Sequence, residues 1–331
     1  MKKFSDLFKA KVAELDGVRS SEDVIIHFLG EEPENKEQAE FIRNTNIRYH
    51  GTDSAEKLLG NFAEIKVQTP DADKTNFIRV DLDSLLDDFY ENGWDSVIGV
   101  VESQIRYADR IQGNAANVLD SLSSYSLIKD RIIVRAINFN EGTLSDYVYR
   151  KLGDIALVLY AVVFDDTEKA ALNTIKIPRY AVDLWDISEQ TVFEEAIKNT
   201  EKFSPVRLYT SILGIEDIPD SEADIMAEDY EMKHLEETAI PLVTSTRRTN
   251  GATALFYNGV KERIAEMFDG SFYVAFTSIH EAMIHKAGTI NPQSIRRHIQ
   301  ATNRAFGVAE TLSNEVYYYN RESGSFTVCE F

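Results

Sequence analysis

The sequence predicts an α+β protein with a mixed, mainly antiparallel sheet, packed helices and a more helical N-terminal region. Three observations support this fold class. Apolar residues recur at helical spacing in about the first 70 residues. Short apolar runs rich in β-branched residues, typical of strands, occur in the middle of the chain. Helical and extended segments then follow one another without the regular strand–helix–strand repeat of a parallel α/β protein.

Residues 1–76 form the predicted helical N-terminal region. Residues 2–15 and 55–65 carry apolar side chains at the spacing of amphipathic helices. The first of these segments is interrupted by Ser5 and Asp6 and by two lysines, so we expect a helix and not a secretion signal.

Residues 77–214 form the predicted α+β core. The segment opens with a strand at 77–80 and a helix that is capped by Asp81 or Asp83 and stopped at Gly93. The remaining elements expected here are helices at 94–111, 118–128 and 189–202 and strands at 131–139, 154–164 and 171–177. The strand at 154–164 is a continuous apolar run, which is typical of a strand buried on both faces.

Residues 238–331 form the predicted C-terminal α+β lobe, which an acidic connector at 215–237 joins to the core. The turn at Asn250-Gly251 and the Asn291-Pro292 helix start are its clearest local signals. The expected strands lie at 240–244, 272–276 and 279–285, a hairpin pairs 316–319 with 326–330, and helices cover 260–268 and 292–306. In the strand at 272–276, Phe272, Val274 and Phe276 alternate toward the interior.

The composition is that of a globular protein, with 331 residues of which 44% are hydrophobic. No apolar run approaches the ~18 residues that a membrane span requires, so we expect no membrane insertion. The single cysteine, Cys329, cannot form an internal disulfide, which favours a reducing cytoplasm.

The net charge of −20 is the strongest compositional feature and disfavours direct binding to nucleic acid. Between Glu216 and Glu237, ten acidic residues stand against one base, Lys233. Such a run is either a solvated surface or a surface that mimics DNA or docks on a basic protein partner.

His280 and Glu281 are the candidate catalytic residues. His280 and His285 are five residues apart, whereas the zinc helix motif needs a four-residue step, so we predict no metal site. His280 remains a candidate acid or base, assisted by Glu281; the alternative is a histidine whose ring nitrogens bond the backbone. The sequence holds none of the phosphate-loop, dinucleotide or paired-cysteine motifs, and we predict no cofactor.

A basic surface is the candidate site for an anionic substrate. On the helix at 292–306, Arg296 and Arg297 share one face with Gln300 and Arg304. Arg247, Arg248 and Asn250 provide further candidate contacts near the Asn250-Gly251 turn. The alternative is that these arginines pair with acidic residues of the chain itself.

Several segments together resemble an uncharacterised bacterial family that carries only a domain-of-unknown-function label and is common in gut anaerobic Firmicutes. The resemblance covers roughly residues 77–331. It rests on FIRVDLDSLLDDFYENG (77–93), IIVRAINF (132–139), IALVLYAVVF (155–164), FEEAIKNT (193–200), NGATALFYNGVKERIAE (250–266), FYVAFTSIHEAMI (272–284) and LSNEVYYYNRESG (312–324). The resemblance implies a cytoplasmic protein of a bacterium or mobile element and supplies no catalytic residues.

Two functions remain open at this point. The first is a non-enzymatic acidic cytoplasmic protein, of phage or mobile-element association, that acts through contacts with a basic protein partner. The second is an enzyme for a small molecule, in which Arg247, Arg296 and Arg297 hold an anionic substrate and His280 is the acid or base. The sequence leaves the oligomeric state open.

Overall fold

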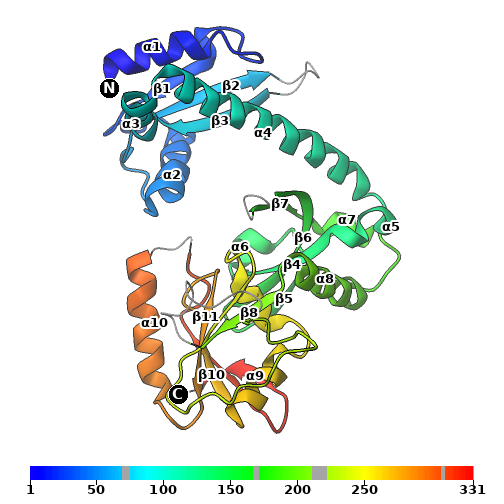
Figure 1. The fold of residues 1–331 in the computed structure, drawn as a ribbon. Coiled ribbons are helices and arrows are strands. Elements are labelled where there is room, and N and C mark those ends of the chain that lie inside the picture. Colours follow the sequence, from blue (N-terminus) through cyan, green and yellow to red (C-terminus); the bar gives the residue numbers. More distant parts are fainter. Residues whose placement is uncertain (69–74, 167–170, 211–221, 307–309, 331) are drawn as a thin grey trace. The chain divides into compact units, whose positions relative to one another are not determined.

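The computed structural model describes residues 1–68, 75–166, 171–210, 222–306 and 310–330 (Figure 1). These residues form two compact units, 1–116 and 117–331, and the boundary falls within one long helix, α4 (Trp94–Ser121). Helices and antiparallel sheets occur in both units, so the predicted α+β class is confirmed.

Unit 1 is a three-stranded antiparallel sheet with helices on both faces. The sheet has the order β1 (Val24–His27), β2 (Phe62–Gln68), β3 (Thr75–Asp81). The helices are α1 (Lys2–Val12), α2 (Lys36–His50), α3 (Leu82–Asn92) and the first part of α4, with a short 3-10 helix, η1 (Ser21–Asp23). Asp81 caps α3 by accepting hydrogen bonds from the backbone N–H groups of Asp83 and Ser84. Of the two predicted caps, Asp81 and Asp83, the structure therefore has Asp81.

The helix predicted at 55–65 is wrong. Residues from Phe62 onward form β2, which pairs along its whole length with β3, and the residues before Phe62 form no helix. Leu58, Leu59, Phe62 and Ile65 fit helical spacing, but the side chains from Ala63 to Gln68 alternate between buried and partly exposed, as in a strand. The separate helices predicted at 94–111 and 118–128 are also corrected: α4 is continuous to Ser121, and α5 (Tyr125–Ile128) is a single turn.

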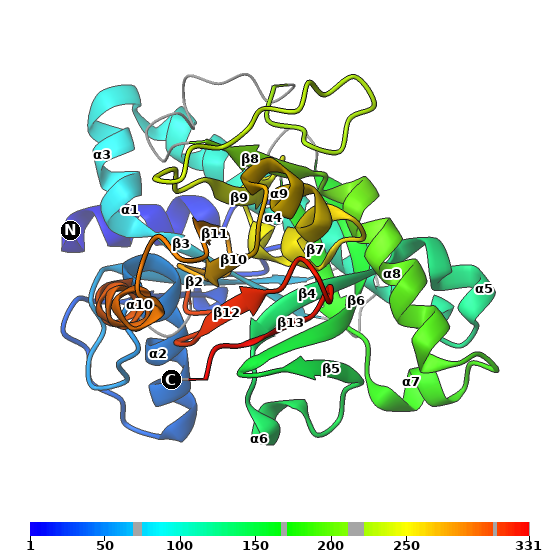
Figure 2. The same cartoon turned by 90° about the horizontal axis from the view of Figure 1, so that it is seen from below.

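Unit 2 contains two antiparallel sheets (Figure 2). In the first, β6 (Ile155–Asp166) pairs with β4 (Ile132–Asn138) on one edge and with β5 (Tyr149–Leu152) and β7 (Ala171–Lys176) on the other. The second has the order β13 (Phe326–Val328), β12 (Val316–Tyr319), β10 (Phe272–Ala275), β11 (Ala282–Lys286), β9 (Leu242–Ser245), β8 (Val206–Tyr209).

Helices surround these two sheets. They are α6 (Glu141–Leu144), α7 (Arg179–Asp183), α8 (Glu189–Phe203), α9 (Val260–Phe268) and α10 (Pro292–Phe306), with the 3-10 helices η2 (Lys129–Arg131) and η4 (Gly251–Phe256). The largest apolar core of the unit joins residues of α8, α9, η4 and both sheets. Because β6 contributes to this core with one face and to a second cluster with the other, it is buried on both faces as its sequence predicts.

The described part of the acidic connector, residues 222–237, lies between β8 and β9, which are neighbours in one sheet. Ala223 and Ile225 are buried, and the backbone N–H of Leu208 donates to the carbonyl of Ala223. This stretch therefore packs on unit 2. The division into 1–76, 77–214 and 238–331 stays a prediction.

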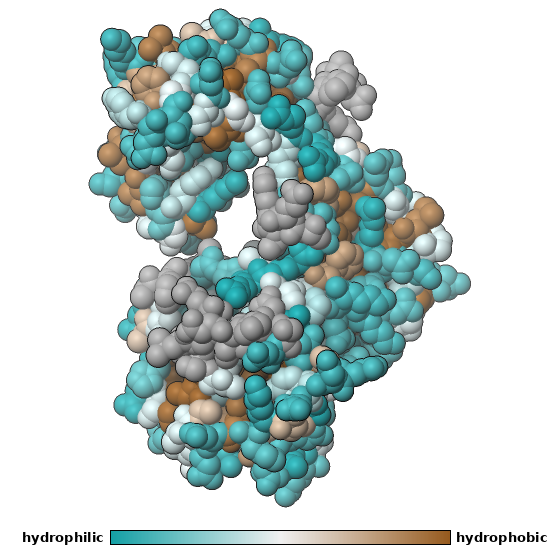
Figure 3. Space-filling view, viewed as in Figure 1, coloured by the Kyte–Doolittle hydropathy of each residue, from teal (hydrophilic) through white to brown (hydrophobic). Residues whose placement is uncertain are grey.

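The exposed surface is mostly hydrophilic, with hydrophobic residues in separate patches on the face shown in Figure 3. Across the described ranges, no helix combines the length and the apolar character needed to cross a bilayer.

Candidate functional site

A pocket lies in unit 2 between α10 and the strands β10 and β11. Its cavity has a volume of about 840 Å³, within the usual range for sites that bind small molecules. Among the described residues, those that line it are Ile240, Arg248, Ala275, Thr277, Ser278, His280, Glu281, Met283, His285, Ile290, Ile295, His298, Ile299, Thr302 and Glu310.

Strand alternation separates the core from the pocket. Successive side chains of a strand point to opposite faces. Phe272 and Val274 in β10 and Ile284 in β11 therefore enter the large core. Ala275 and Met283 lie on the opposite face, where they pack with residues of α10, and Met283 and His285 line the pocket.

Helix α10 covers this second face. Ile295 and Ile299 are buried against Ala275 and Val316. His298 and Thr302 lie three and seven residues after Ile295, so all four share the helix face that meets the pocket. Asn291 fixes the start of the helix, because its side-chain oxygen accepts a hydrogen bond of 2.9 Å from the backbone N–H of Gln293.

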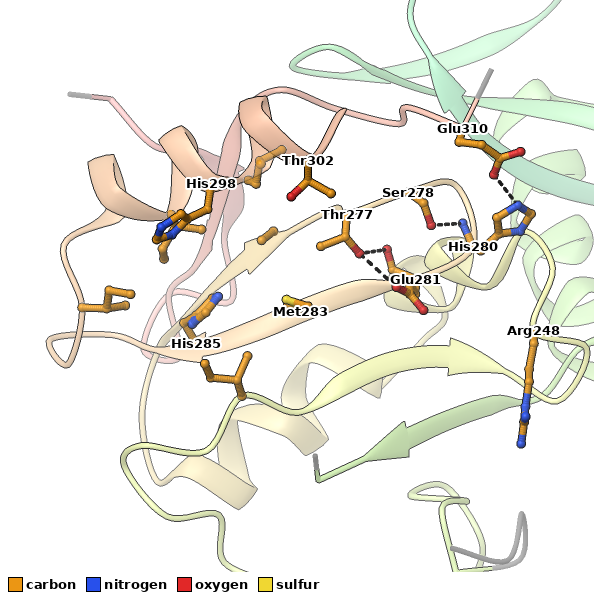
Figure 4. A pocket seen from close by; sticks show the side chains of 15 residues that line it. Arg248, Thr277, Ser278, His280, Glu281, Met283, His285, His298, Thr302 and Glu310 are labelled. Atoms are coloured by element: carbon orange, nitrogen blue, oxygen red, sulfur yellow. Dashed lines mark hydrogen bonds and ion pairs between the residues drawn. The ribbon is translucent and has the colours of Figure 1, made fainter. Parts of the chain in front are cut away.

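His280 is held by hydrogen bonds at both ring nitrogens. Nδ1 accepts from the backbone N–H of Asn250 at 3.1 Å. Nε2 lies 2.6 Å from Oε2 of Glu310, a contact drawn in Figure 4. Because a backbone N–H can only donate, Nδ1 carries no proton, and the neutral ring donates from Nε2 to the Glu310 carboxylate. The side chain of His280 is 32% exposed, so it borders the cavity without lying free in it.

The loop before β11 is hydrogen-bonded to β9 and to the turn before η4. The hydroxyl of Thr244 donates to the carbonyl of His280 at 2.8 Å, and the hydroxyl of Ser278 accepts from the N–H of His280 at 3.0 Å. A Cβ atom on Gly251 would lie 2.5 Å from the His280 carbonyl oxygen, so only glycine permits this approach. Asn250 adopts a left-handed backbone conformation, φ 54°, that directs its N–H at the ring of His280.

Glu281 lies at the polar end of the pocket beside Thr277. The hydroxyl of Thr277 is 3.4 Å from Oε1 of Glu281, a long hydrogen bond. Figure 4 shows these two side chains together, with Thr302 pointing from α10 toward the strands. In the part of the chain that the structure describes, Glu281 makes no ion pair.

His285 and His298 lie at the other end of the pocket (Figure 4). Burial lowers the pKa of His285, and the nearby His298 lowers it further. His285 is therefore neutral near pH 7, and its ring can accept as well as donate a hydrogen bond.

The predicted anion-binding arginines do not converge on this pocket. Arg247 bonds Asp165 at 2.7 Å and the carbonyl of Phe203. Arg296 bonds Glu315 at 2.5 Å. Arg297 bonds the Gln293 carbonyl and the Ser294 hydroxyl of its own helix, so none of these three is among the described residues that line the cavity.

Arg248 is the one predicted arginine among the lining residues. Its guanidinium lies 5.9 Å from the centre of the Tyr209 ring, and in Figure 4 it extends away from His280 and Glu281. Of the seven predicted site residues, the structure therefore brings Arg248, His280 and Glu281 to one pocket, and Asn250 stands behind His280.

Sequence reasoning missed Glu310 and the histidine pair. Glu310 is 30 residues from His280 and belongs to no recognisable motif. The sequence could have shown that His298 lies near the apolar face of its helix. It follows the apolar Ile295 by three residues and precedes Ile299 by one.

The described residues contain no group of three or more histidine, cysteine or carboxylate side chains that could hold a metal ion. The fold and pocket thus define an α+β protein with a ligand-sized cavity between a helix and a sheet. The chain belongs to a family of unknown function, DUF5688, which matches residues 66–321. No curated protein and no solved structure matches it significantly.

Proposed function

We propose that the protein is a non-enzymatic binding protein whose pocket in unit 2 takes a small molecule with an apolar body. The pocket itself supports the proposal, because a cavity of about 840 Å³ is large enough for such a ligand and its middle is lined by apolar side chains. These side chains are Ile240, Ala275, Met283, Ile290, Ile295 and Ile299.

The geometry around His280 favours binding over catalysis. A general base needs a ring nitrogen with a free lone pair, and Nδ1 already accepts from Asn250. The arginines assigned to an anionic substrate contact other parts of the chain. The enzymatic alternative, with His280 as acid or base, would require both arrangements to change on substrate binding.

Paired tryptophan substitutions on α10 test the pocket. Thr302 points into the cavity, whereas the neighbouring Ala301 is exposed. The probe is the neutral dye N-phenyl-1-naphthylamine, whose fluorescence rises in apolar sites. We expect wild type and Ala301→Trp to bind it with equal affinity and Thr302→Trp to bind at least about ten-fold more weakly. Equal binding by both variants, or no binding by wild type, would contradict the proposal.

A second candidate function, docking on a basic protein partner, rests on an acidic stripe of unit 1. No lysine or arginine occurs between Arg79 and Arg106, while Asp83, Asp87 and Glu91 lie four residues apart along exposed positions of α3. Like charges at this spacing destabilise a helix, so a basic partner would relieve a cost that the free protein carries. A DNA-mimicking surface is one form that such a stripe can take.

Affinity purification from a bacterial lysate tests the stripe. The variant Asp87→Asn/Glu91→Gln removes two of its charges, and Glu32→Gln/Glu34→Gln removes two exposed charges elsewhere in unit 1. We expect a basic protein to be retained by wild type and by the control pair and lost from the stripe variant. Retention of the same proteins by all three would reject the stripe. A cytoplasmic location, and an origin in gut anaerobes or their mobile elements, complete the proposal and stay predictions.

A further inference from the structure

The charges that line the unit 2 pocket are mainly carboxylates. Glu281 and Glu310 both line the cavity, and Arg248 is the one arginine or lysine among the described lining residues. The charged side chains of the pocket are therefore mostly negative, whereas the anion site predicted from the arginines of the helix at 292–306 would be positive.

The two carboxylates differ in their partners. Glu310 accepts a short hydrogen bond from His280, which stabilises its charge. Glu281 is partly buried, and its carboxylate has a single described hydrogen bond, the long one from the Thr277 hydroxyl, which also lies 3.4 Å from the backbone carbonyl of Glu281. A carboxylate held away from bulk water without a cation raises the free energy of the empty pocket, and a bound cation would lower it.

The surroundings of Glu281 suit an ammonium group. The hydroxyl oxygens of Thr277 and Ser278 lie in the same part of the lining and can accept N–H donors. Beyond them the cavity is apolar, and at its other end His285 is neutral near pH 7 and adds no positive charge.

We propose that the pocket binds an amphipathic organic amine, with its ammonium group on Glu281 and its apolar chain between α10 and β11. The inference rests on the proposed binding function and adds the chemical class of the ligand. The sign of the charge distinguishes an amine from a fatty acid or another anion of the same size.

A matched series of eight-carbon ligands tests the sign. Octylamine, 1-octanol and octanoate share one apolar chain and carry a positive, neutral and negative head group at pH 8. Titration calorimetry of the full-length protein, below the concentrations at which these ligands form micelles, gives their affinities. We expect octylamine to bind about ten-fold more tightly than 1-octanol, and octanoate to bind more weakly than either, because an ion pair with a partly desolvated carboxylate favours only the amine.

Two glutamine variants assign the effect to one carboxylate. Glu281→Gln should bind octylamine about ten-fold more weakly than wild type and 1-octanol equally well. Glu322→Gln, which removes an exposed charge outside the pocket, should bind both as wild type does.

The outcomes separate this inference from the proposed function. If 1-octanol and octylamine bind equally, or octanoate binds best, the cation inference is wrong while the pocket remains a binding site. If octylamine affinity is unchanged in Glu281→Gln, the ammonium group does not contact Glu281 and the inference is likewise overturned. If neither the octyl series nor the naphthylamine dye binds wild type, both proposals fail.

Discussion

Nε2 of His280 and Oε2 of Glu310 are 2.6 Å apart, although the two residues are 30 positions apart in the sequence. A second link, from the backbone N–H of Ile279 to the carbonyl of Glu310, fixes the same two segments at 2.9 Å. Both contacts join the loop before β11 to Glu310, which follows α10 in the sequence.

We expect His280→Ala to lower the free energy of unfolding by about 1 to 2 kcal/mol, because it removes a hydrogen bond to a charged group that is only partly exposed. Glu310→Gln should lower it by less, because the amide oxygen can still accept the bond from His280 but carries no charge. Urea denaturation at pH 8 measures the change. His298→Ala, at an exposed position without a described hydrogen bond, is the control and should stay within about 0.5 kcal/mol of wild type. If His280→Ala unfolds at the same urea concentration as wild type, the His280 ring does not stabilise the loop before β11.

Gly251→Ala should destabilise unit 2 by about 3 kcal/mol or prevent its folding, because the new Cβ would lie 2.3 Å from Oγ1 of Thr244 and 2.5 Å from the carbonyl oxygen of His280. Gly99→Ala adds the same methyl group in α4, where no atom outside the local helix backbone lies within 4 Å. This control should gain about 0.5 to 1 kcal/mol from helix propensity. Thermal unfolding of both variants gives the comparison, and equal melting temperatures would show that the approach at Gly251 is looser than described.

The stability of unit 2 should fall as the pH drops below 6.5 and through the lower pKa of folded His285. Burial keeps that pKa below its ordinary value, so in this window the unfolded chain binds a proton that the folded protein does not. The titratable groups facing His285 are His298 from α10 and Tyr273, its partner in β10. His285→Gln should remove this part of the pH dependence, whereas His234→Gln, at an exposed position, should leave it unchanged. Urea midpoints of both variants, measured from pH 8 to pH 5, test this expectation. If the midpoint of His285→Gln falls with pH as steeply as that of wild type, the pH dependence does not come from His285.

Tyr317→Phe should lower the free energy of unfolding by about 1 to 2 kcal/mol. Its hydroxyl lies 2.7 Å from Oδ1 of Asp154 and 2.9 Å from the carbonyl of Leu152, and it joins β12 to the turn between β5 and β6. Tyr318→Phe, one residue further along the same strand, removes a hydroxyl without a described bond and should change stability by less than about 0.5 kcal/mol. Chemical denaturation of the pair measures the difference. If both variants lose the same free energy of unfolding, the loss does not come from the contact between Tyr317 and Asp154.

Local signals predicted most elements of unit 2 because each depends on neighbouring residues. The helix predicted at 189–202, the Asn291-Pro292 helix start and the alternation in β10 all appear as expected. The helix prediction for residues 55–65 was wrong because Phe62 fits helical spacing and is also the first residue of a strand. Only the pairing of β2 with β3 distinguishes the helix from the strand.

The candidate site was predicted only in part, because its geometry depends on contacts between distant segments. His280 and Glu281 were found from the sequence, but the contact that determines the state of His280 comes from Glu310 and from the backbone of Asn250. Helical spacing predicts one basic face on α10, and Arg296 in this face contacts Glu315 of the chain that follows the helix. Helical spacing alone does not show which acid lies opposite such a face.

The alternation of β11 has an evolutionary consequence. Ala282 and Ile284 belong to the core, while Glu281, Met283 and His285 between and beside them line the cavity. Substitutions at the second set can change the size and charge of the cavity while the first set keeps the sheet packed. Members of one family can therefore differ in this cavity on an unchanged scaffold, and the residues at these three positions would be the first to compare among them.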